Sequence, residues 1–94
     1  PGTGISATDR AKTLAALASP DTGPSDLLRP GHVVPVRAHA DGVLGRCGPA
    51  EAAVDLARLA GRRPAAGLCE IVSRRSPVMM ARGTEPVEFA IEHG

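Results

Sequence analysis

The near absence of aromatic residues limits what this chain can fold into. Phe89 is the only aromatic residue among 94, although 43% of the chain is hydrophobic. Any core must therefore be built from alanine, valine, leucine and isoleucine, which bury less area per residue than aromatic side chains. A chain of this length buries only about 60–65% of the surface that it exposes when unfolded. We expect a single small core that needs the support of a partner surface.

The charge balance and the cysteines narrow the class of protein. Eleven basic and ten acidic residues give a formal charge of +1, which predicts neither a nucleic-acid-binding nor a membrane-binding surface. No stretch reaches the roughly 18–20 apolar residues of a membrane span, and no signal-peptide pattern opens the chain. We therefore expect a cytoplasmic location. Cys47 and Cys69 lack a metal-binding spacing, so we expect reduced thiols. Because the chain opens on Pro1, we also expect a fragment of a longer protein.

Local patterns predict helices that alternate with short strands. Helices that start at a capping residue or a proline are expected over about residues 7–18, 49–60 and 84–93. Strands are expected over residues 32–38 and 68–73, with a hairpin return over 41–46. Residues 19–31 and 74–77 have the composition of loops. This order implies an α/β or α+β fold with layered packing.

The start of the second expected helix is the most informative local feature. Residues 45–61 read GRCGPAEAAVDLARLAG, a glycine-flanked turn that leads into a helix with Glu51 in its first turn. The start of a helix has free N–H groups and the positive end of the dipole, which favour anions. Arg46 either is a solvated charge at this position or binds an anion. Glu51 either complements the helix dipole or takes part in a site.

Other residues are of types that carry chemistry. His32, beside the start of a predicted strand, is either a hydrogen-bonded structural histidine or a site residue. Glu70 lies within an apolar strand pattern and must either pair with an arginine or act as an acid or base, because an unpaired buried carboxylate is costly. Cys47 has no visible histidine partner and is not expected to be a nucleophile. Arg74 and Arg75 are expected as a pair of surface loop charges.

Three stretches, in this order, resemble one enzyme family. They are TGISATDRAKT at residues 3–13, LLRPGHVVPVRA at 27–38, and EAAVDLARLAG with LCEIV within 51–72. On these motifs the chain is identified as a member of the 3,4-dihydroxy-2-butanone 4-phosphate synthase family. The resemblance implies an α+β fold, a layered α/β/α sandwich, of which residues 1–94 form the C-terminal half of one domain.

The resemblance also implies an activity and partners. The family serves riboflavin biosynthesis and converts ribulose 5-phosphate into dihydroxybutanone phosphate and formate, with Mg²⁺ as cofactor. Its site is shared by the two subunits of a homodimer, and the domain is often fused to GTP cyclohydrolase II. The partners implied are therefore a sugar phosphate, a second copy of the chain and the fused domain, with no nucleic acid and no membrane.

The resemblance assigns site residues one by one. It implies catalytic roles for two residues, His32 and Glu70. It implies substrate-binding roles for Thr3, Asp9, Arg10, Arg46, Gly48 and Glu51. No metal ligand is expected in this chain, because Pro49 stands where the family has its magnesium-binding histidine, and a proline has no ligand atom. Ala50 likewise stands where the family has a phosphate-binding threonine, and the loop at residues 73–77 is basic where the family's loop is acidic.

Two functions of different class follow from these departures. The chain is either part of a synthase domain, impaired as it stands, whose other half supplies the metal ligands, or part of a degenerate domain that serves dimerisation or scaffolding. The loss of one ligand without an obvious substitute favours the second, since a magnesium site needs several well-placed ligands. A ligand from outside these residues would favour the first.

Overall fold

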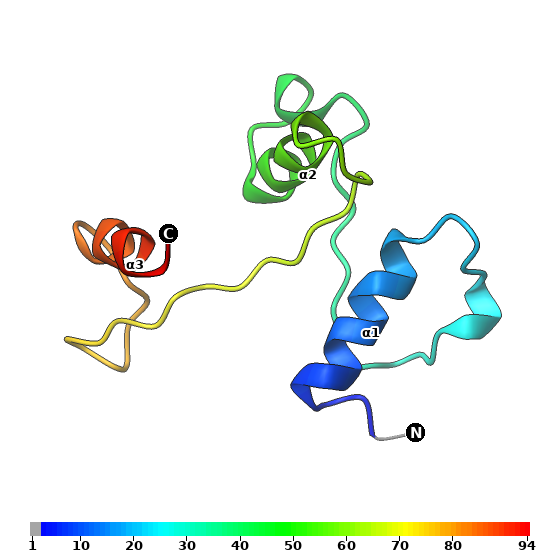
Figure 1. The fold of residues 1–94 in the computed structure, drawn as a ribbon, viewed down its shortest axis with the longest axis horizontal. Coiled ribbons are helices and arrows are strands. Elements are labelled where there is room, and N and C mark those ends of the chain that lie inside the picture. Colours follow the sequence, from blue (N-terminus) through cyan, green and yellow to red (C-terminus); the bar gives the residue numbers. More distant parts are fainter. Residues whose placement is uncertain (1–2) are drawn as a thin grey trace.

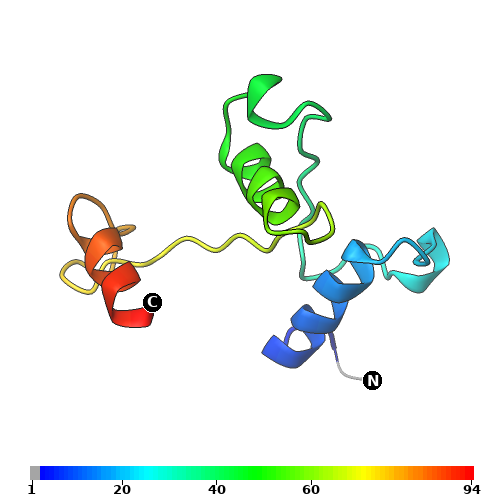
Figure 2. The same cartoon turned by 45° about the horizontal axis from the view of Figure 1, so that its top comes forward.

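The computed structural model describes residues 3–94 and consists of helices joined by extended segments. Three α-helices and two short 3-10 helices follow one another along the chain: α1 (Ala7–Ala18), η1 (Pro24–Asp26), η2 (Gly42–Leu44), α2 (Pro49–Leu59) and α3 (Glu85–His93). The α-helices lie apart from one another in both ribbon views (Figures 1 and 2). The three predicted helices are confirmed. None of the described helices is long and apolar enough to cross a membrane.

Helix α1 begins at the predicted cap. The Ser6 Oγ accepts a hydrogen bond of 3.0 Å from the Asp9 N–H, which satisfies one free donor of the first turn. The Asp9 carboxylate does not return to the cap residue as in a full capping box. It accepts a 3.3 Å bond from the Gly4 N–H instead, and so holds the preceding turn against the start of the helix.

Helix α2 and the turn η2 pack against each other, and they are the only two elements to do so within residues 3–94. The Asp55 Oδ2 accepts a 2.9 Å hydrogen bond from the Val43 N–H. Gly42 has a φ of +64° and lies so close to the Asp55 carboxylate that a Cβ could not fit there. This small unit positions the start of α2.

The predicted strands are not formed. Residues 34–39 and 65–71 run without regular secondary structure, and η2 replaces the expected hairpin return over 41–46. In the part of the chain that the structure describes, the one β-bridge joins Val72 to Met80. A strand requires hydrogen bonds to a neighbouring strand, and these residues provide no such partner for either extended segment. The expected layering of helices on a sheet is therefore not seen in residues 3–94.

The single core that the length suggested is also absent from the described residues. None of their hydrophobic side chains is buried, and Leu28, Leu44 and Val78 are each more than 90% exposed. The accessible surface is 7747 Å², whereas a compact chain of this mass has about 5,100 Å². The radius of gyration is 15.5 Å, against about 12 Å for a compact domain of this length. The apolar faces are left open to a partner.

Candidate functional site at the start of helix α2

A buried carboxylate lies at the start of α2. The Glu51 residue is 1% exposed and is the only fully buried side chain among residues 3–94. Its Oε2 accepts two hydrogen bonds of 2.8 Å, from Arg46 Nη2 and from the His39 backbone N–H. The Arg46 bond and then the His39 bond lower the pKa of Glu51 to about 2. The ionised carboxylate thus ties two loop residues to the first turn of α2.

Arg46 is held at one end of its guanidinium group. Its Nη2 donates to Glu51 and also, at 2.8 Å, to the Arg37 carbonyl oxygen. The hydrogen bond that Arg46 donates to Glu51 raises the pKa of the guanidinium still further and so favours its charged form. The arginine side chain is 56% exposed, and its Nη1 and Nε have no hydrogen-bond partner within residues 3–94. Fixed donors therefore remain available to a ligand.

The residues between Arg46 and Glu51 allow this close arrangement. A Cβ at Gly48, the N-cap residue, would lie 2.5 Å from the Glu51 Oε1, so any larger residue would force the carboxylate to move. Pro49 occupies the first turn, where its missing N–H costs no helical hydrogen bond. It also removes one of the backbone donors that an anion could use. Ala50 adds no polar side-chain atom.

A second group of predicted residues lies at the start of α1. A Cβ at Gly4, whose φ is +86°, would lie 3.7 Å from the His32 Cδ2. The fold thus brings His32 to the turn that Asp9 holds. Thr3 and Arg10 flank this turn in the chain and are exposed, as is His32.

Glu70 belongs to neither group. It lies in the extended segment between α2 and α3, is exposed, and forms no ion pair with any residue that the structure describes. Of the two alternatives for Glu70, pairing with an arginine is not seen in this structure, because no neighbouring strand covers the residue, and the acid or base role stays a prediction. Cys69, in the same segment, is exposed too, and both cysteines are free thiols, as expected.

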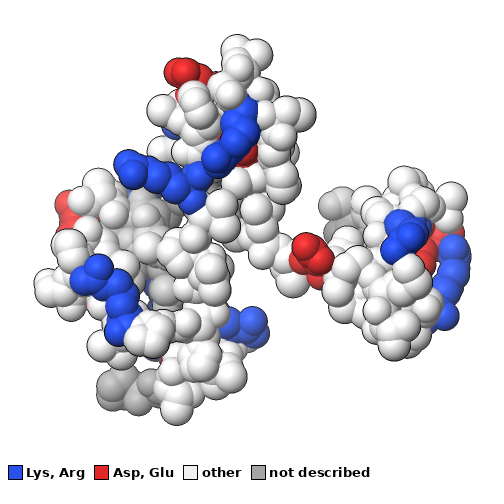
Figure 3. All heavy atoms as spheres, turned by 180° about the vertical axis from the view of Figure 1, so that it is seen from behind, with Lys and Arg blue, Asp and Glu red and all other residues white. Residues whose placement is uncertain are grey.

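The basic loop after this segment is neutralised within the chain. Arg74 and Arg75 form 2.9 Å ion pairs with Glu92 and Glu88 of α3. Figure 3 shows basic and acidic atoms side by side on the lobe that contains α3. All four side chains are more than half exposed, which agrees with the predicted surface charges. These arginines are already paired and do not form a free anion site.

The described residues do not fit a magnesium ion. No three histidine, cysteine, aspartate or glutamate side chains within them lie close enough together to hold a metal. Pro49 has no ligand atom, and the Glu51 Oε2 already accepts two hydrogen bonds. We therefore derive no chemical step through a metal from these residues.

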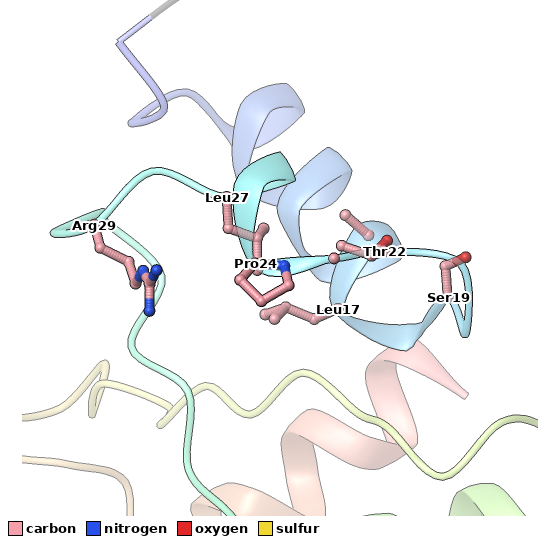
Figure 4. A pocket seen from close by; sticks show the side chains of 8 residues that line it. Leu17, Ser19, Thr22, Pro24, Leu27 and Arg29 are labelled. Carbon is pink, nitrogen blue, oxygen red and sulfur yellow. The ribbon is translucent and has the colours of Figure 1, made fainter.

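A hollow of about 330 Å³ lies elsewhere, between the end of α1 and η1. Leu17, Pro24 and Leu27 line it with apolar atoms, and Ser19, Thr22 and Arg29 add polar ones (Figure 4). None of the predicted site residues lines it. We do not place the site there.

Comparison with known families decides the identity. Residues 1–94 match the family model described as 3,4-dihydroxy-2-butanone 4-phosphate synthase. The chain belongs to this family. It is 58% identical over 92 residues to the riboflavin biosynthesis protein RibBA of Rhodococcus erythropolis and 57% identical over 93 residues to that of Mycobacterium tuberculosis. These alignments cover 98% and 99% of the chain, and the chain spans 22% of each relative.

A solved structure of the synthase family agrees with this assignment. The crystal structure of a 3,4-dihydroxy-2-butanone 4-phosphate synthase in a cation-free form is 45% identical to the chain, with a TM-score of 0.78. The match covers 99% of this chain and 49% of that one. The synthase fold thus accounts for how these helices are placed, and about half of the solved domain has no counterpart in these residues.

The anchoring contact of Glu51 is the feature that the sequence indicated least. A glutamate in the first turn of a helix is common, because it complements the dipole. The available signals were the glycine three residues before it and the arginine five residues before it. Neither signal reveals that the carboxylate turns back over Gly48.

Proposed function

We propose that residues 1–94 form the C-terminal half of a 3,4-dihydroxy-2-butanone 4-phosphate synthase domain that acts on ribulose 5-phosphate in riboflavin biosynthesis. The main support is the fixed guanidinium of Arg46, with free Nη1 and Nε donors, at the start of α2. A charged guanidinium with free donors in this position suits a phosphate group, whose oxygens accept charge-assisted hydrogen bonds. The 57–58% identity to riboflavin biosynthesis proteins supports the same assignment.

In this proposal the two groups of site residues take different roles. Arg46 and the backbone around Gly48 bind the phosphate, where the helix dipole adds to the attraction. His32 and Glu70 move protons on the sugar carbons, and Thr3, Asp9 and Arg10 bind the rest of the substrate. Glu70 reaches the site only when its extended segment is ordered by the remainder of the domain.

The layered sandwich and the homodimer are part of the same proposal. The extended segments 34–39 and 65–71 would pair with strands from the other half of the domain, and the exposed apolar side chains would be covered by that half and by a second subunit. The exposure of every large hydrophobic side chain of α1 and α3 supports this. The 49% coverage of the solved synthase leaves room for the other half.

Pro49 and Ala50 support a second candidate function. No three ligating side chains lie together within the described residues, so a Mg²⁺ site would need ligands from outside them. We therefore propose that catalysis is impaired in the protein as it stands. A non-catalytic domain that serves dimerisation or scaffolding, beside a fused GTP cyclohydrolase II in the cytoplasm, is the alternative.

Formate release from ribulose 5-phosphate with Mg²⁺ separates the two candidates. The full-length protein that contains this chain would be compared with its Pro49→His, Ala50→Thr double variant. Activity in the unmodified protein means that outside residues complete the site. Activity only in the double variant means an intact scaffold that has lost its chemistry. Absence of formate from both, with the fold retained, would contradict the enzymatic proposal.

A further inference from the structure

We infer that Glu51 is a positioning residue, which holds the Arg46 guanidinium in place for a phosphate group and does not itself touch the substrate. The inference rests on the proposed function, because that function places the phosphate at Arg46. Glu51, expected from the sequence to bind the substrate, would instead hold the arginine that binds it.

The first observation is how completely one arginine nitrogen is used. The two hydrogens of Nη2 are directed to the Glu51 carboxylate and to the Arg37 carbonyl oxygen, both at 2.8 Å. A guanidinium group is planar and rigid, so two bonds to one end fix the direction of its remaining donors. Nη1 and Nε are thereby oriented before any ligand arrives.

The second observation is the burial of the anchor. Glu51 is 1% exposed, whereas the side chain of Arg46 is 56% exposed. A phosphate can therefore reach the arginine but not the carboxylate. The Glu51 Oε1 faces Gly48, and its Oε2 already accepts from Arg46 and His39, so the carboxylate is fully engaged by the protein.

The third observation is the loss of other polar side chains at this helix start. Pro49 and Ala50 carry no side-chain donor. Between Gly45 and Glu51, Arg46 is therefore the one residue with a positively charged side-chain donor for an anion. A long arginine side chain loses rotamer freedom when it binds a ligand. The anchor fixes the side chain beforehand, which matters most where a single arginine carries the contact.

The test is a double-mutant cycle on ligand affinity in the full-length protein. The dissociation constant of ribulose 5-phosphate, with inorganic phosphate as a second probe, would be measured for Glu51→Gln, Glu51→Ala, Arg46→Ala and the double alanine variant. We expect Glu51→Ala to weaken binding by about five- to tenfold, and Glu51→Gln, which keeps an acceptor, to weaken it less. We expect Arg46→Ala to abolish most of the affinity, and the double variant to be no weaker than Arg46→Ala.

A matched control distinguishes positioning from general stabilisation. Glu85, like Glu51, lies in the first turn of its helix. Its carboxylate accepts a 2.6 Å hydrogen bond from the Ser73 Oγ in the preceding loop, far along the chain from Arg46. Glu85→Gln should lower the melting temperature without changing the dissociation constant. If Glu51→Ala does not fold, Glu51→Gln decides, because it preserves the shape of the side chain.

The outcomes of the two proposals can be told apart. If Arg46→Ala weakens binding but both Glu51 variants bind as tightly as the wild type, or more tightly, the positioning role is wrong and the phosphate contact stands. If Arg46→Ala itself leaves the affinity unchanged, the phosphate contact in the proposed function is wrong. Additive losses in the double variant would also overturn the positioning role.

Discussion

A 2.8 Å hydrogen bond joins Arg46 to Glu51. The Glu51 carboxylate in this bond is buried, whereas more than half of the Arg46 side chain is exposed to solvent. A buried charge is tolerated only when it is paired and hydrogen-bonded. The arginine therefore does more than face a ligand, because it also stabilises the ionised state of Glu51. The following predictions concern this contact and its neighbours.

Acid should weaken the α2–η2 unit through Glu51. The pKa of this carboxyl is lowered to about 2, chiefly by the Arg46 hydrogen bond, from 4.5. A lowered native pKa contributes stability above pH 4.5 and loses it progressively as the pH falls toward 2. The protection factor of the His39 amide against hydrogen exchange, which corrects for the intrinsic pH dependence of the exchange rate, should fall over this pH range in the full-length protein. In Glu51→Gln the corresponding fall should be absent, and identical pH profiles of the protection factor in the two proteins would contradict the prediction.

A methyl group at Gly48 should displace Glu51. The added Cβ would lie 2.5 Å from the Glu51 Oε1, which forces the carboxylate or the backbone to move. Gly48→Ala should lower the melting temperature and weaken phosphate binding at Arg46. Gly23→Ala is the matched control, since Gly23 is also an N-cap, has a φ of −100°, and its Cβ would be 3.8 Å from the nearest atom. Equal effects of both substitutions would contradict the steric explanation.

Removal of the Asp55 carboxylate should release η2 from α2. Its Oδ2 accepts the Val43 N–H at 2.9 Å, and a hydrogen bond of this kind contributes about 0.5–1.5 kcal/mol. Asp55→Ala should accelerate the amide exchange of Val43 by a corresponding factor of about 2 to 13. Asp41→Ala is the control, because that side chain is 80% exposed and accepts no bond from this amide. Unchanged exchange at Val43 in Asp55→Ala would argue against the contact.

The exposed ion pairs of α3 should contribute less to the stability of the fold than the buried Ser73 beside them. Arg75 and Glu88 are more than half exposed, and such pairs contribute about 0–1 kcal/mol and weaken with salt. Ser73 is 4% exposed, donates to Glu85 and accepts from the Ser76 N–H. Ser73→Ala should lower the melting temperature of the full-length protein more than Glu88→Gln does. The opposite order, at physiological salt, would contradict this ranking.

The isolated chain should expose apolar surface. None of its described hydrophobic side chains is buried, so a dye that binds such surface should fluoresce strongly with residues 1–94 alone. Addition of the proposed other half of the domain as a separate polypeptide should suppress this fluorescence. Weak dye binding by the isolated chain would mean that it buries a core of its own.

The sequence predicted the helices because their signals are local. Ser6 caps α1, Pro49 lies in the first turn of α2, and Pro86 lies in the first turn of α3. Each acts on the few residues around it, whatever the rest of the protein does.

Local signals could not predict whether the expected strands would form, because a strand needs a partner from elsewhere in the protein. Val34 and Val36 have the β-branched side chains of a strand, but no neighbouring segment pairs with their backbone or covers their side chains, which are 83% and 69% exposed. The site was predictable only in part for a similar reason. Arg46 was placed at the helix start by sequence, whereas its bond to the Arg37 carbonyl depends on how the loop folds back.

The separation of the three α-helices has a thermodynamic consequence. Cooperative unfolding requires shared contacts, and within residues 3–94 no two of these helices pack against each other. Each helical unit should therefore open with its own free energy, and protonation of Glu51 should leave α3 unaffected. Heating such a chain alone should give a broad succession of local transitions. A single sharp unfolding transition would require partner surfaces that pack against all three helices and couple their unfolding.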